Sequence, residues 1–506
     1  MAIPVGDSYS AESGVAIYGG RSAAGIAASS LTVTDFADLT HYQRDSTGAG
    51  KTINVSIQCG GSPSRIEWRA VDYYTGAPIN SWATLISNPS AVETVPVYMP
   101  ASKWAKIQVR DSVNTALMHS TTTRMSVGIK WGWEGQSNVF NRLTTAFASP
   151  TGDRQCLIAG RVTPKRLGNI NDSVAANSVS GSPGYSTGLT IQTDVRGDAL
   201  VYFANLLSQN MGMTVMIIER ATSGSNIDNW MSDAGSKAPW TDFVAAVTAQ
   251  GGDIEGCTWH QGETNANTMS RATRLAKMAQ LHGQMHTLTG RNASTFKFCI
   301  TTIGPGPYIG SSDGEFGTIR EADNWYARNT AGAFIGASAH NTATPGDPVH
   351  IDGEGFGRIG RVEAKSVLAA YGIGVSGAGP RITGMARSGT AVDVSVVHAG
   401  GTALTDGAGG TGTALTGFQF FDAGAGGAAI AVTGSTILNA TTIRLTLASA
   451  PVGTLTGSYG MSDVPHGVFS SPGNTFVAAS TVCDNATYYN STVGCVLQPL
   501  AAITVA

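Results

Sequence analysis

The chain changes its pattern twice along its 506 residues, and this restricts its fold more than any other feature. Between residues 124 and 374, short apolar runs alternate with segments whose apolar residues recur at helical spacing. The runs read MSVGIKW, MTVMIIE, IEGCTW, FKFCITTI and AFIGASA, and the helical segments include 198–211, 270–288 and 357–372. This alternation predicts an α/β domain with a parallel sheet and helices on both of its faces.

The flanking segments contain only strand-like patterns. Residues 30–123 and 375–506 consist of short alternating runs separated by Gly, Pro, Ser and Asn, and each predicts a β-sandwich. The first 29 residues are rich in Gly, Ala and Ser and are expected to form an arm or an attachment segment. Three folded domains agree with the length of the chain.

Composition narrows the class of partner. Charged residues make up 13% of the chain, against about 25% in average soluble proteins. A net charge of -3 without a clustered basic face argues against nucleic acid and against an anionic membrane surface. No apolar stretch reaches the roughly 18 residues of a membrane span, and the first residues lack the pattern of a signal peptide. We therefore expect a neutral ligand.

Cysteine and histidine spacing gives no sign of a metal. The six cysteines form no CxxC or Cys/His zinc pattern, and the nine histidines include no HExxH. We therefore predict neither a metal nor another cofactor. Cys483 and Cys495 are candidates for a disulfide across the loop between them, and the spacing leaves this pairing open.

Polar residues follow three of the predicted strands, at the sheet edge where ligands of α/β proteins bind. Ser137, in EGQSNVFNRL, is either a helix N-cap or a nucleophile. Gly224 is either an ordinary turn residue or an amide that approaches a bound oxygen. Gln261, in CTWHQGETNAN, either fixes its loop or directs its amide into the same space.

A fourth position carries an acid and a base. Asp347 and His350 stand three residues apart before a helical segment, so the carboxylate can hold one imidazole nitrogen while the other faces a serine hydroxyl. Such a pair can equally be structural. Glu263 is interpreted as a neighbouring or helix-start residue, and His260 as a packed or substrate-contacting residue rather than the base.

Together, the blocks GQSN, SGSNIDNW, WHQGETNA and DPVH, in this order, resemble the SGNH hydrolase superfamily. The resemblance is to its sialate O-acetylesterase-like group of carbohydrate acetylesterases, and it extends over about 125–372. It implies a central flavodoxin-like parallel sheet, here flanked by N- and C-terminal β-sandwiches that resemble accessory modules. The second block departs from the family, because TSGSN stands where many relatives have GGT.

The resemblance also implies roles for individual residues. Ser137 is expected to be the nucleophile, His350 the base, and Asp347 the residue that orients it. The amides of Ser137 and Gly224 and the Gln261 side chain are expected to form the oxyanion hole. Four further residues are expected at the site: Asn138 and Glu263 beside the catalytic groups, and His260 and Trp230 in contact with substrate.

The predicted reaction is the removal of O-acetyl groups from a carbohydrate or polysaccharide through an acyl-enzyme. Two alternatives stay open: a non-catalytic glycan-binding or virion attachment protein, and a lipid or aryl esterase on the same fold. The low charge and the flanking sandwiches favour an extracellular or virion-associated location, as in a phage tail fibre or tailspike. A homo-oligomer is left open, with a trimer expected for a tailspike.

Overall fold

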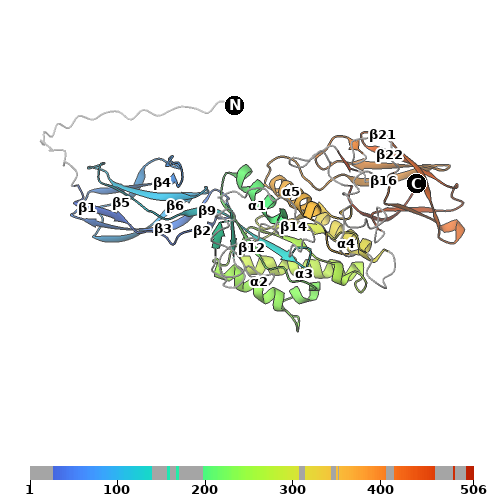
Figure 1. Ribbon diagram of the computed structural model, residues 1–506, viewed down its shortest axis with the longest axis horizontal. Helices are drawn as coiled ribbons and strands as arrows, with labels where there is room; N and C mark the ends of the chain where they lie inside the picture. The colour runs from blue at the N-terminus through green and yellow to red at the C-terminus, as the bar shows by residue number, and fades with distance from the viewer. Residues whose placement is uncertain are drawn as a thin grey trace, which may run out of the picture.

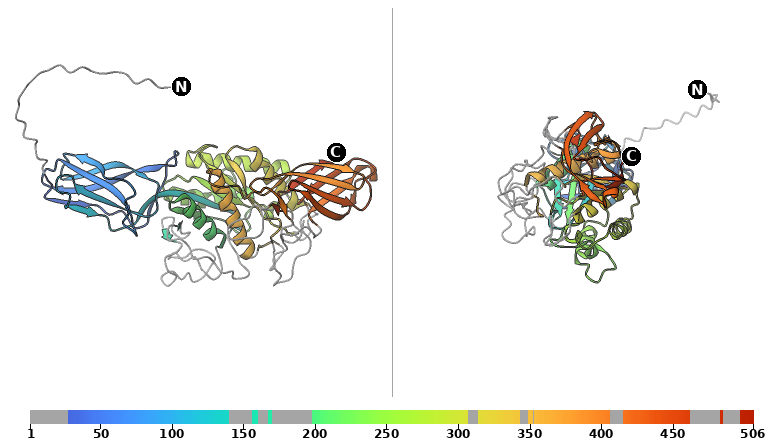
Figure 2. Two further views of the ribbon diagram at one scale, coloured as in Figure 1. Left: turned by 90° about the horizontal axis from the view of Figure 1, so that it is seen from above. Right: turned by 90° about the vertical axis from the view of Figure 1, so that its right-hand side faces the viewer.

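The computed structural model describes residues 27–139, 156–159, 167–169, 198–306, 314–342, 349–351, 353–405, 415–461, 483–484 and 497–506. Three bodies follow one another along the long axis of the molecule (Figure 1). The N-terminal strands form the first body, a helix-covered sheet forms the second, and the C-terminal strands form the third. The view from above shows the same order (Figure 2).

The N-terminal body has two layers of strands around one core. The first layer is an antiparallel sheet of β1 (Ser30–Val33), β3 (Gly50–Gly60) and β6 (Val92–Pro100), in the order β1-β3-β6. The second contains β4 (Arg65–Asp72), β5 (Ala83–Ser87), β7 (Ala105–Asp111) and β8 (Met118–Ser120). Alternate apolar residues of both layers are buried against each other, as the period of two predicts.

One long strand joins this body to the next. β9 (Met125–Gly135) is buried at every position. Its first half pairs in parallel with β2 (Thr40–Gln43), from Thr40 opposite Met125 to Gln43 opposite Gly128. Its second half pairs with strands of the central sheet. The boundary predicted near residue 124 therefore coincides with the start of a strand that both bodies share.

The central sheet has β9 in its interior. Its order is β11-β10-β12-β9-β13-β14-β15, and all of these strands run parallel except β11. The further strands are β10 (Cys156–Ala159), β11 (Leu167–Asn169), β12 (Val215–Glu219), β13 (Gly256–His260), β14 (Lys297–Thr302) and β15 (Ala333–Ser338). Continuous apolar runs are typical of such strands, because both faces of the sheet are covered.

Helices cover the two faces of the sheet. On one face, α1 (Asp198–Met211) and α5 (Gly353–Ala370) pack against each other and share a core with the sheet. On the other face lie α2 (Ala238–Ala249), α3 (Arg271–Thr289) and α4 (Glu315–Asn329). In the described part of the chain, no helix is long and apolar enough to cross a membrane.

The C-terminal body again consists of strands around one core. One antiparallel sheet has the order β16-β17-β22-β21 and another has the order β20-β19-β23-β25. Their bounds are β16 (Arg381–Ser388), β17 (Ala391–Val397), β19 (Phe418–Asp422), β20 (Ala428–Ile430), β21 (Val432–Asn439), β22 (Thr442–Leu447), β23 (Leu455–Tyr459) and β25 (Leu500–Thr504). The short strands β18 (Leu404–Thr405) and β24 (Cys483–Asp484) pair separately. Cys495 lies outside the described residues, so its disulfide with Cys483 stays a prediction.

Helix α4 attaches the C-terminal body to the central sheet. The Asn324 side chain donates to the Pro499 carbonyl at 2.8 Å, and the Arg320 guanidinium donates to the Gly460 carbonyl at 3.2 Å. Both side chains are fully buried. Because buried polar groups are costly to leave without partners, these bonds fix the contact between the two bodies.

A buried acid in the central core predicts a pH-dependent stability. Glu363 on α5 accepts a hydrogen bond from the Thr301 hydroxyl, and burial raises the pKa of Glu363 from 4.5 to about 8. The folded state therefore holds this proton more tightly than the unfolded chain does. The resulting stabilisation is complete below the unfolded pKa and is lost as the pH rises through about 8.

We expect Glu363→Gln to remove this pH dependence, which is on the order of a few kcal/mol of unfolding free energy. Urea denaturation of both proteins at pH 5 and pH 8 provides the measurement. Equal loss of stability in wild type and variant over this range would contradict the role given to Glu363.

Candidate active site

Three strand ends meet at the carboxyl edge of the central sheet. β9 ends at Gly135 between the ends of β12 and β13. Gly135 has a φ of 148°, and a Cβ there would lie 2.0 Å from the His260 carbonyl oxygen, so no larger residue fits. The Gln136 N–H donates to that carbonyl at 3.3 Å, and the Thr222 N–H donates to the Gly135 carbonyl at 3.0 Å. The loops that follow the three strands therefore start side by side.

Ser137 lies in the tight turn that follows β9. The Val139 N–H closes this turn on the Gln136 carbonyl at 2.9 Å. Among the described residues, the Ser137 hydroxyl and N–H have no hydrogen-bond partner. The side chain is 6% exposed. The helix that Ser137 was predicted to begin falls in residues 140–155, outside the described part of the chain.

Gly224 lies in the loop after β12, and both sides of it are tied to the Ser137 turn. On one side, Thr222 bonds to Gly135. On the other, the Ser225 carbonyl accepts from the Gln261 amide, which also donates to the Gln136 side chain. Gly224 is exposed, has a φ of 70°, and its N–H has no acceptor within the described residues. Its N–H is therefore available near Ser137.

Gln261 is a brace between the three loops. Its side chain is 0% exposed, and its amide nitrogen lies 3.1 Å from the Gln136 side-chain oxygen, 3.2 Å from the Ser225 carbonyl and 2.7 Å from Asn265 Oδ1. An amide has two N–H donors, and protein acceptors occupy both. The expectation that Gln261 directs its N–H groups at a bound oxygen is therefore not met in this structure.

A buried ion pair holds Gln261 from behind. The Arg274 guanidinium on α3 donates to Gln261 Oε1 at 2.7 Å and binds Asp323 on α4 at 2.7 and 2.9 Å. Both charged side chains are fully buried. Burial raises the pKa of Asp323, while the charge of Arg274 acts in the opposite direction. Sequence reasoning missed this pair, because nothing in the spacing of residues 274 and 323 relates them to each other.

The brace predicts a loss of stability as well as of rate. We expect Gln261→Ala to lower the unfolding free energy by about 1–3 kcal/mol, because Arg274 and Gln136 lose a buried partner. Urea denaturation measures this, with the exposed Gln280→Ala on α3 as control. Unchanged stability together with slower turnover would instead support the original assignment of Gln261 as an oxyanion donor.

Asn138 connects the Ser137 turn to His350. Its side-chain amide donates to the Val349 carbonyl at 2.9 Å, and its oxygen accepts from the Ile351 N–H at 3.1 Å. The residue after Ser137 thus holds the backbone on both sides of His350. Asp347 lies outside the described residues, so its place beside His350 stays a prediction.

Glu263 and His260 pack under this connection. Glu263 accepts from Asn138 at 2.5 Å and lies 3.7 Å from His260 Nε2. Burial raises the pKa of Glu263, whereas the Asn138 bond and the charges of His350 and Arg274 lower it. Burial also lowers the pKa of His260 to about 3, so this imidazole is neutral at neutral pH.

Two residues expected to contact substrate are core residues instead. Trp230, in the short helix η2 (Ile227–Trp230), is 0% exposed and packs edge-on against Trp259, with ring centroids 5.3 Å apart. Its indole N–H donates to the Ser225 hydroxyl at 3.1 Å. The His260 ring is 3% exposed. Both expectations are corrected here, because neither ring faces solvent; both support the loops from below.

No group of three potential metal-ligating side chains occurs among the described residues. The arrangement therefore consists of a serine hydroxyl, an imidazole fixed through Asn138 and N–H donors of the adjoining loops. A nucleophile, a base and oxyanion donors are the elements of acyl transfer.

Comparison with known proteins identifies what the central body resembles. Residues 188–369 match the family model of carbohydrate esterases described as sialic acid-specific acetylesterases. This match includes Gly224, Gln261 and His350 and begins after Ser137. No curated protein sequence matches the chain significantly.

Solved structures share the fold at low identity. A carbohydrate acetylesterase from Xanthomonas citri is 17% identical, with 92% of this chain and 97% of that chain covered and a TM-score of 0.59. A protein from Arabidopsis thaliana is 15% identical over 47% of this chain and 97% of its own, with a TM-score of 0.37. A family two carbohydrate esterase from Clostridium thermocellum is 10% identical over 64% and 90%, with a TM-score of 0.29.

Proposed function

We propose that this chain, which resembles the sialic acid-specific acetylesterases among carbohydrate esterases, is a serine esterase that removes O-acetyl groups from a carbohydrate. One observation carries the proposal. The Asn138 side chain bonds to the backbone on both sides of His350 and is itself the neighbour of Ser137. An exposed edge of the sheet thereby holds a hydroxyl and an imidazole on adjoining segments.

In the proposed reaction, His350 accepts the proton of the Ser137 hydroxyl while its oxygen attacks the acetyl carbonyl. The N–H groups of Ser137 and Gly224 stabilise the oxyanion. The sugar hydroxyl then leaves with the proton that His350 returns. Water, activated by His350, next cleaves the acyl-enzyme and releases acetate. Asp347 is assigned to orient His350.

The topology supports the same assignment. Numbered by chain order, β12-β9-β13-β14-β15 have the order 2-1-3-4-5, which is that of flavodoxin-like sheets. In such sheets, ligands bind outside the carboxyl ends of the strands near β9, where Ser137 lies. We interpret the two flanking bodies as β-sandwich accessory modules.

The test is an acetate-release assay with the full chain. We expect acetate from acetylated polysaccharides and far less product from long-chain acyl esters. Retention of glycan without any release of acetate would favour the attachment-protein alternative. Preferred cleavage of the long-chain esters would favour a lipid esterase.

A further inference from the structure

A second cavity lies at the amino-terminal edge of the central sheet, opposite the edge that carries Ser137. Its volume is about 450 Å³. Arg44 to Gly48, between β2 and β3, line it from the N-terminal body. Glu255, which precedes β13, and the segment from Arg291 to Lys297, which leads into β14, line it from the central body. The cavity is thus formed where two bodies meet.

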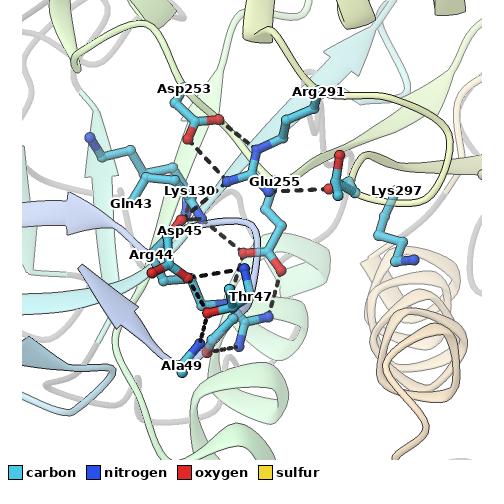
Figure 3. Close-up of polar contacts among 12 residues, drawn as sticks. Gln43, Arg44, Asp45, Thr47, Ala49, Lys130, Asp253, Glu255, Arg291 and Lys297 are labelled. Carbon is cyan, nitrogen blue, oxygen red and sulfur yellow. Dashed lines mark hydrogen bonds and ion pairs between the residues drawn. The ribbon is translucent and has the colours of Figure 1, made fainter. Parts of the chain in front are cut away.

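Two paired arginines form the wall of the cavity (Figure 3). Arg44 binds both carboxylate oxygens of Glu255, at 2.8 and 2.5 Å. Arg291 binds both oxygens of Asp253, at 2.6 and 3.0 Å. These pairs neutralise their own charges, and their bidentate geometry fixes the wall before any ligand arrives.

Lys297 contributes a cation that these pairs do not neutralise. Its ammonium donates to the Ser294 carbonyl at 3.2 Å and lies 5.9 Å from the Tyr371 ring centroid. Within the described residues, no carboxylate lies at ion-pair distance from it. The helix ends nearby do not use it either, because the Gly212 and Ile373 N–H groups satisfy carbonyls in the last turns of α1 and α5.

Hydroxyl groups line the cavity beside Lys297. Thr47 donates its hydroxyl to Asp45, and the hydroxyls of Ser294 and Thr295 donate toward Asn292. A hydroxyl that donates to the protein keeps its oxygen as an acceptor, so these groups can accept hydrogen bonds from hydroxyls of a ligand. The Tyr371 ring and Met213 supply an apolar surface within the same lining.

We propose that this cavity binds a carboxylated sugar unit, with the carboxylate on Lys297 and the ring hydroxyls on Thr47, Ser294 and Thr295. One unpaired cation fits one carboxylate, several acceptor oxygens fit several hydroxyls, and the apolar patch fits the carbon face of a sugar ring. The site lies across the sheet from Ser137 and does not depend on the proposed ester cleavage.

Titration calorimetry on the full chain tests the site with glucuronate, with glucose as the neutral match and with acetate as the simple anion. We expect glucuronate to bind at least tenfold more tightly than either of the others. Lys297→Ala should weaken glucuronate binding at least tenfold, Lys297→Arg should retain it, and the exposed Lys237→Ala should leave it unchanged.

Glucose binding as tightly as glucuronate, acetate binding as tightly, or no glucuronate binding would each overturn the proposal. Unchanged glucuronate binding in Lys297→Ala would overturn it as well. Binding should persist in His350→Ala, which separates this cavity from the sheet edge at Ser137. Cleavage of a small acetyl ester by Lys297→Ala should match wild type, so failure of the esterase and failure of this site are distinguished.

Discussion

Ser137→Ala is expected to reduce acetate release about 10⁶-fold, because loss of a nucleophile removes the acyl-enzyme route. The substitution deletes one oxygen atom from a side chain that is 6% exposed and has no hydrogen-bond partner among the described residues. The free energy of unfolding should therefore change little. The measurement is acetate release from an acetylated polysaccharide, together with urea denaturation of both proteins.

Ser236→Ala is the matched control, because this serine is exposed in the segment between β12 and α2. It should retain the wild-type rate. Acetate release at the normal rate by Ser137→Ala would refute the assignment of the nucleophile. An inactive wild type that still binds acetylated glycan would instead favour a protein whose central body binds without catalysis.

The periodicity of the sequence predicted the helices whose apolar stripe is regular. Segments 198–211, 270–288 and 357–372 correspond to α1, α3 and α5. Helix α4 was not predicted, because its buried side includes Arg320, Asp323 and Asn324, which interrupt the apolar pattern. Those residues are buried with partners from other parts of the chain, and such partners leave no trace in local spacing.

Long-range pairing was also outside what the pattern could predict. The apolar run 125–131 correctly indicated a strand, but β9 continues to Gly135 and serves two bodies. The pairing of its first half with β2 depends on residues some 85 positions earlier. A composition change marks where such a strand begins, but it does not show that the sheet continues across the boundary.

For the candidate site, the order of strands predicted position better than role. Residues after parallel strands share one edge, so Ser137, Gly224 and Gln261 were correctly expected near one another. Whether a polar side chain faces the substrate or the core depends on orientation and on buried partners. Gln261 is bound by Arg274, and Trp230 packs on Trp259. Neither relation is visible in the motifs themselves.

Two histidines of the site are expected to differ sharply when each is replaced. His350→Ala should lower acetate release about as much as Ser137→Ala, on the order of 10⁶-fold, because nucleophile and base act as a unit. His260→Ala should lower the rate far less. The His260 imidazole is buried, its pKa is lowered to about 3, and its Nε2 faces Glu263 at 3.7 Å. Its loss should appear mainly as reduced stability.

Acetate release and urea denaturation of both variants, with the double variant Ser137→Ala/His350→Ala, separate these roles. If the two residues share one proton transfer, the double variant should be no slower than either single variant. Multiplied losses would mean that they act independently. A greater loss of rate in His260→Ala than in His350→Ala would move the base to the buried side of Glu263 and contradict the connection through Asn138.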